Sequence, residues 1–90
     1  MKYENLEIGD ILYICYSSNY GKDELIITKV TATTDETIAL SDLYSSLDAI
    51  DEDWVLKFRG NYINQYKLLK VLGKNLTLLD IKQKYPELFL

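Results

Sequence analysis

The 90-residue sequence contains no histidine, one cysteine, one proline and four glycines. Without histidine, a Ser-His-Asp triad, a Cys-His pair and a histidine-ligated metal site are all excluded. A single cysteine excludes an intrachain disulfide, and the isolated glycines form no phosphate-binding loop. The sequence therefore predicts a protein that is not an enzyme and has no cofactor and no metal site.

Long hydrophobic runs are also missing. No window reaches 18 consecutive apolar residues, and the first residues form no apolar leader, so neither a transmembrane helix nor a signal peptide is expected. The lone Cys15 lies in an apolar run, which fits a reducing compartment, and we expect a cytoplasmic location. Domains typically hold about 100–150 residues, so residues 1–90 are expected to form one domain.

Three apolar, β-branched runs separated by turn residues fill the first half of the chain. They cover residues 11–16, 24–32 and 37–41. Strands at this spacing, joined by short turns, predict an antiparallel β-meander over residues 10–41.

A different pattern follows the meander. Apolar residues recur at helical spacing at Leu43, Leu47, Ile50 and Trp54. This predicts a helical segment over residues 42–53, with a short helix or helical loop at 42–52, although Ser, Asp and Tyr are weak helix formers.

The alternation of apolar and polar residues from Trp54 to Arg59 predicts a half-buried strand. Gly60 and Asn61 fit a two-residue turn, so we expect a hairpin over residues 54–72. The spacing of apolar residues within 62–72 also fits a helix, and that alternative stays open.

The end of the chain carries helix signals. Thr77 and Asp80 have the spacing of a capping box, and Pro86 is a stop, so a helix is predicted over residues 77–85. The apolar tail of Leu88, Phe89 and Leu90 is expected to seal the end of the barrel, and a dimer contact is the alternative. The predicted fold is mainly β with a C-terminal helix, as a small five-stranded antiparallel Src homology 3-like barrel. The alternative is an open α+β antiparallel sheet with two or three helices.

Charge is distributed unevenly in this acidic chain, whose net charge is −4 and whose pI is about 4.6. Residues 30–56 hold seven acids and no base, whereas residues 57–90 hold seven bases and two acids. Such asymmetry indicates electrostatic partners. The candidate surface for a basic protein partner is the set of acids in the helical segment, namely Asp42, Asp48, Asp51, Glu52 and Asp53. The alternative interpretation of these acids is a solvated face.

The excess of Lys over Arg and the abundance of Ile and Tyr indicate the coding bias of an AT-rich genome. Together with the small size and the missing catalytic residues, this bias favours an accessory or inhibitory protein of a phage or mobile element. Its expected activity is protein–protein contact, with no membrane involvement and an oligomeric state left open.

Nucleic-acid binding is the alternative function. In the predicted hairpin, one face would carry cations among aromatic rings, through Lys57, Arg59, Tyr62, Asn64 and Tyr66. Single-stranded nucleic acids and RNA are bound by such faces. The acidic pI argues against this reading, because nucleic-acid-binding domains are usually basic.

Overall fold

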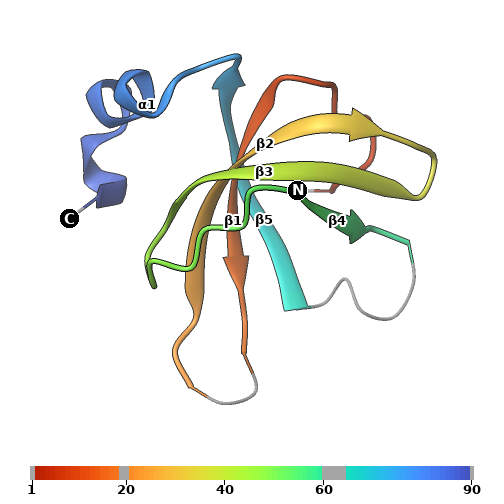
Figure 1. Cartoon of the computed structure of the whole chain (residues 1–90), viewed down its shortest axis with the longest axis horizontal. Helices are drawn as coiled ribbons and strands as arrows, with labels where there is room; N and C mark the ends of the chain where they lie inside the picture. The colour runs from red at the N-terminus through yellow and green to blue at the C-terminus, as the bar shows by residue number, and fades with distance from the viewer. Residues whose placement is uncertain (1, 19–20, 60–64, 90) are drawn as a thin grey trace.

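The computed structural model describes residues 2–18, 21–59 and 65–89. Five strands are the main elements of the fold, and two short helical elements follow them (Figure 1). The strands are β1 (Asp10–Tyr16), β2 (Glu24–Thr33), β3 (Thr37–Ser45), β4 (Trp54–Lys57) and β5 (Tyr66–Lys74). The helical elements are the helix α1 (Leu78–Lys84) and the 3-10 helix η2 (Pro86–Phe89).

The strands form one antiparallel sheet in the order β4-β3-β2-β1-β5. The predicted meander is confirmed, because β1 pairs with β2 and β2 pairs with β3. On its other side β1 pairs with β5, where Tyr16 lies opposite Tyr66. The continuous apolar run of β1 therefore belongs to an interior strand, as such runs often do.

The predicted pairing of the 54–72 hairpin is wrong. β4 pairs with β3, with Val55 opposite Ala39, and lies at the opposite edge of the sheet from β5. Alternation within a segment identifies a strand but does not identify the strand with which it pairs. The strand interpretation of the second half is confirmed by β5. Residues 60–64, with the expected turn and with Tyr62 and Asn64, lie outside the described residues.

The helical segment predicted over 42–53 is also wrong. Residues 42–45 continue β3, and residues 46–53 form an irregular loop with a positive φ of 55° at Asp48. The long β2 provides backbone partners for this continuation, with Ile26 opposite Ser45. Strand pairing therefore outweighs the weak helical propensity of the segment. Residues 46–53 are termed the acidic loop.

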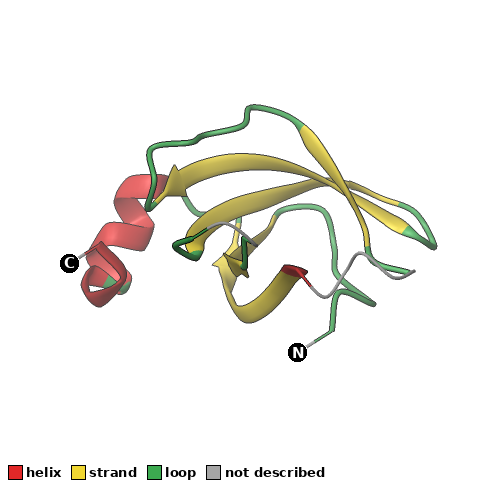
Figure 2. Cartoon of the chain, turned by 90° about the horizontal axis from the view of Figure 1, so that it is seen from below, coloured by secondary structure: helices red, strands yellow, loops and turns green. Residues whose placement is uncertain are grey.

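Apolar side chains pack on both faces of the sheet. The inner core contains Tyr3, Leu12, Ile14, Ile26, Val30, Ile38, Leu40, Leu56 and Leu68. Because it includes Leu56 of one edge strand and Leu68 of the other, the sheet curls around it (Figure 2). The outer core contains Ile11, Ile27, Leu72 and Ile81. Successive residues of β1 enter opposite cores, as the pleat requires.

Helix α1 begins where its signals predict. The Thr77 hydroxyl accepts a hydrogen bond from the Asp80 backbone N–H at 3.1 Å. In return, the Asp80 carboxylate accepts one from the Thr77 N–H at 3.0 Å, which completes the capping box. The helix places Ile81 in the outer core, fully buried.

The C-terminal tail covers the outer core. Leu88 and Phe89 pack against it, which confirms the expected sealing role, while Leu90 lies outside the described residues. The Tyr85 hydroxyl donates a hydrogen bond to the Leu72 carbonyl at 3.0 Å, so the end of α1 is tied to β5. Within the described ranges, no helix is long and apolar enough to cross a membrane.

The protein is thus mainly β, with a five-stranded antiparallel sheet and a short C-terminal helix. Its Cα radius of gyration of 12.4 Å matches the roughly 12 Å of a compact domain of this length. The described residues of β4 and β5 form no backbone pairing with each other, so the sheet is not closed.

Candidate functional site

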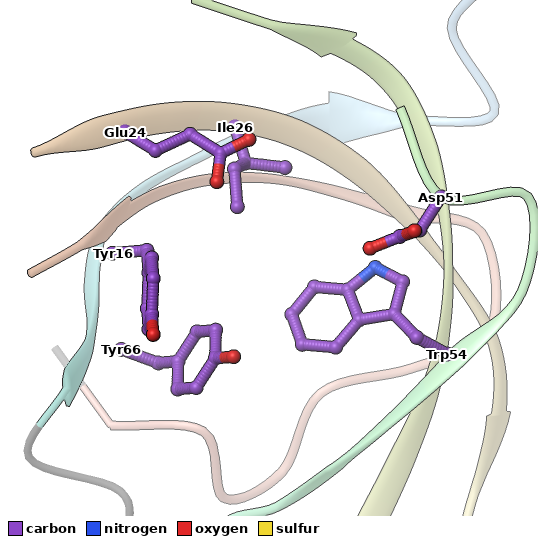
Figure 3. A pocket seen from close by; sticks show the side chains of 6 residues that line it. All are labelled: Tyr16, Glu24, Ile26, Asp51, Trp54 and Tyr66. Carbon is purple, nitrogen blue, oxygen red and sulfur yellow. The ribbon is translucent and has the colours of Figure 1, made fainter. Parts of the chain in front are cut away.

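A pocket opens at the end of the sheet where β1 finishes and where β2 and β5 begin. Its volume is about 180 Å³. Figure 3 shows three aromatic rings around the hollow, with two carboxylates and one aliphatic side chain beside them. This aromatic pocket is lined by Tyr16, Glu24, Ile26, Asp51, Trp54 and Tyr66.

The pairing register of the strands brings three of these lining residues together. Tyr16 lies opposite Glu24 on β2 and opposite Tyr66 on β5, so the three residues form one row across the sheet. Residues opposite each other in a sheet share a face, and Tyr16 and Tyr66 pack on the inner core. Ile26, two residues beyond Glu24, has the same orientation by alternation.

Trp54 completes the aromatic wall from the other edge strand. Its ring centroid lies 5.4 Å from that of Tyr66, which in turn lies 4.7 Å from that of Tyr16. The rings are tilted by 37° and 32°, so they pack as a continuous series. β4 and β5 therefore meet here through side chains, although their described backbones are not paired.

Asp42 holds both Trp54 and the acidic loop in position. One carboxylate oxygen accepts a hydrogen bond from the Trp54 indole N–H at 2.7 Å, and the other accepts one from the Asp51 backbone N–H at 3.1 Å. The Asp42 N–H donates to the Asp51 carbonyl at 2.9 Å. Asp42 is only 8% exposed, so it is a structural acceptor and not a displayed acid of the predicted surface.

The pocket has a negative electrostatic environment. Burial raises the pKa of the Tyr66 phenol, and Tyr16, Glu24, Asp51 and Asp42 raise it further. The Glu24 carboxylate accepts a hydrogen bond from the Ser45 hydroxyl. The Asp51 carboxylate has no hydrogen-bond or ion-pair partner in the described part of the chain. Among the described residues that line this pocket there is no lysine or arginine.

The remaining predicted acids, Asp48, Glu52 and Asp53, are exposed on the acidic loop. Two large aliphatic side chains are displayed among them, since Leu47 is 49% and Ile50 is 55% exposed. Within residues 2–18, 21–59 and 65–89, no ion pair joins these acids to the basic half of the chain. The acidic loop is therefore available as an acidic surface with apolar side chains in it.

Three residues of the predicted nucleic-acid face, Lys57, Arg59 and Tyr66, belong to the described part of the chain, and Tyr66 lies apart from the other two. Lys57 and Arg59 are exposed at the β4 edge, whereas Tyr66 lines the aromatic pocket from β5. Arg59 lines a second hollow, of about 250 Å³, whose lining includes the acids Glu4 and Asp35. The described residues thus form no face of alternating cations and rings around Tyr66.

Among the described residues, no three Cys, Asp or Glu side chains gather as metal ligands. No protein-family model, curated protein or solved structure matches this chain. The candidate site is therefore defined by its geometry alone.

Sequence reasoning singled out Asp51 and Tyr66 but missed their partners Tyr16, Glu24 and Trp54 as site residues. The sequence feature that could have indicated Tyr16 is the high tyrosine content, eight in 90 residues, because tyrosine suits binding faces. The row of Tyr66, Tyr16 and Glu24 depends on the β1–β5 pairing, which joins segments far apart in the chain.

Proposed function

We propose that this chain is a non-enzymatic binding protein that contacts a basic surface of a partner protein through its acidic loop. The supporting observation is the set of side chains that the acidic loop exposes. The loop exposes Asp48, Glu52 and Asp53 in the same short segment as Leu47 and Ile50, and no described base forms an ion pair with these acids. Interfaces combine apolar contact area with polar groups, and complementary charge accelerates and selects association. An accessory or inhibitory role in the cytoplasm is part of this proposal.

The test uses charge reversal outside the structural core. The double variant Glu52→Lys with Asp53→Lys changes two adjacent exposed acids of the loop. The matched control, Asp35→Lys with Glu36→Lys, changes two adjacent exposed acids in the turn between β2 and β3. Both variants change the net charge equally, so they separate a local surface from a general effect of charge.

Each protein is immobilised and exposed to lysate of its native cells, with and without nuclease, and bound proteins are identified by mass spectrometry. We expect a stoichiometric protein that survives nuclease, binds the control variant and is lost with the loop variant. Equal retention by both variants would overturn the proposal. Capture that disappears with nuclease would favour the nucleic-acid alternative in its place.

The barrel-like closure expected from the sequence belongs to this proposal. Its support is the contact of Trp54 with Tyr66, which brings the side chains of the two edge strands together. In a Src homology 3-like arrangement, this junction would lie beside the acidic loop, since Asp51 lines the same pocket.

A further inference from the structure

The aromatic pocket beside the acidic loop has walls that suit a cation. Three ring systems, from Tyr16, Tyr66 and Trp54, line one small hollow (Figure 3). The faces of aromatic rings carry negative potential and attract Lys, Arg or ligand cations placed over them. The carboxylates of Glu24 and Asp51 border the same hollow and add full negative charges. The two carboxylates would repel an anionic occupant, and a neutral occupant would gain none of the attraction between a cation and this wall.

The pocket is built before any ligand arrives. Trp54 is fixed by the hydrogen bond from its indole N–H to Asp42, and Tyr66 is held between the rings of Tyr16 and Trp54. Asp51 is anchored through its backbone at both its N–H and its carbonyl. Binding to groups that are already in place costs less ordering entropy, which favours affinity.

The size of the hollow selects the kind of occupant. At about 180 Å³ it is smaller than the roughly 300–1,000 Å³ of pockets that enclose drug-sized ligands. A group the size of one side chain fits this scale, whereas a drug-sized ligand does not.

Among cationic side chains, arginine matches both features of the wall. Its guanidinium group is planar and weakly hydrated, stacks on aromatic faces and donates paired hydrogen bonds to carboxylates. The Asp51 carboxylate, which has no hydrogen-bond partner among the described residues, is available to accept them. The ammonium group of lysine is strongly hydrated and loses more on entering an aromatic hollow.

We propose that the aromatic pocket binds the guanidinium group of an arginine side chain of the partner protein, stacked on the rings of Trp54 and Tyr66 and paired with Asp51. This proposal rests on the proposed function, because it supplies the specific contact within the acidic contact surface. The arginine would anchor the partner, and the acidic loop would guide its approach.

The experiment uses the full chain and simple probes. Trp54 is the only tryptophan, so its intrinsic fluorescence reports directly on the pocket. N-acetyl-arginine amide is titrated at constant ionic strength, alongside N-acetyl-citrulline amide, which has the same shape without the charge. N-acetyl-lysine amide and its trimethylated form test the ammonium alternatives. We expect saturable binding of the arginine probe, with the citrulline probe about tenfold weaker.

Two variants test the role of the carboxylates. Asp51→Asn keeps the backbone hydrogen bonds that anchor the loop, and Glu24→Gln provides a second, independent change. Each is expected to weaken the arginine probe about three- to tenfold. The matched control Asp53→Asn removes an exposed loop charge that does not line the pocket, and should have no such effect.

Several results would overturn the proposal. These are a fluorescence response that does not saturate, equal binding of arginine and citrulline, tighter binding of either ammonium probe, or equal effects of Asp51→Asn and Asp53→Asn. The titration needs no partner protein. Its failure therefore leaves the pull-down result intact, and a failed pull-down leaves the titration result intact.

Discussion

The Tyr3 hydroxyl donates a hydrogen bond to the backbone carbonyl of Tyr66 at 3.0 Å and so ties the N-terminal segment to β5. Tyr3 is 6% exposed and belongs to the inner core. Burial, and next the neighbouring Tyr66, raise the pKa of the Tyr3 phenol well above its usual value of 10.0. The folded protein therefore keeps a proton on Tyr3 that the unfolded chain releases in alkaline solution.

This difference predicts a specific alkaline destabilisation. The contribution of the Tyr3 phenol to the free energy of unfolding is complete below about pH 10. It declines as the pH rises further, because the phenol then ionises in the unfolded state only. Tyr3→Phe should lower the free energy of unfolding by about 1 kcal/mol near neutral pH through loss of the hydrogen bond. The difference in free energy of unfolding between wild type and variant, measured by urea denaturation, should decrease above about pH 10. A gap that is constant with pH would contradict this assignment.

Removal of the Asp42 carboxylate should loosen the site and the fold together. Asp42→Ala leaves the Trp54 indole N–H and the Asp51 N–H without their acceptor. The expected loss of unfolding free energy is about 1–3 kcal/mol, with a change in tryptophan emission of the native state. The control Asp53→Ala, at an exposed loop position, should change stability by no more than about 0.5 kcal/mol. Similar effects of the two changes would refute a structural role for Asp42.

Helix α1 offers a matched pair of aliphatic residues. Ile81 is fully buried in the outer core, whereas Leu79 is 64% exposed. Ile81→Ala should cost about 2–5 kcal/mol in chemical denaturation, because it removes buried methylenes and leaves a cavity. Leu79→Ala should change the free energy by no more than about 0.5 kcal/mol. If both variants unfold at the same denaturant concentration, α1 does not seal the core in solution.

The sequence predicts correctly those strands and helices that are determined by the residues of their own segment. The apolar runs predict β1 and β2 to within a residue or two, and the Thr77–Asp80 capping box marks the start of α1 correctly. In both cases the residues that carry the signal also make the stabilising contacts. The same reasoning finds the burial pattern of β4, in which Leu56 is buried and Val55 is exposed.

The predictions that fail depend on distant partners. The stripe of Leu43, Leu47, Ile50 and Trp54 is no helix face, because its members serve different surroundings. Leu43 packs on the outer core, Leu47 and Ile50 face solvent, and Trp54 lines the pocket. Helical spacing alone does not reveal that the paired β2 extends far enough to keep this segment extended.

The candidate site is only half visible in the sequence for the same reason. The acids of residues 42–53 are conspicuous in composition, yet Asp42 is buried and Asp51 lines the pocket. The aromatic wall requires the β1–β5 register and the approach of the two edge strands. Neither is encoded by a short stretch of residues.

The pairing of β5 with β1 has a consequence for the order of assembly on the ribosome. β1 is synthesised first, whereas its second neighbour in the sheet, β5, follows β2, β3 and β4 in the chain. Asp10 of β1 pairs with Lys74 of β5. Contacts between distant segments form late because the intervening chain must close a long loop. A nascent chain that has not reached Tyr66 therefore presents the bare hydrogen-bonding edge of its most apolar strand, which is a template for aggregation. In the folded protein β5 covers that edge by pairing with β1.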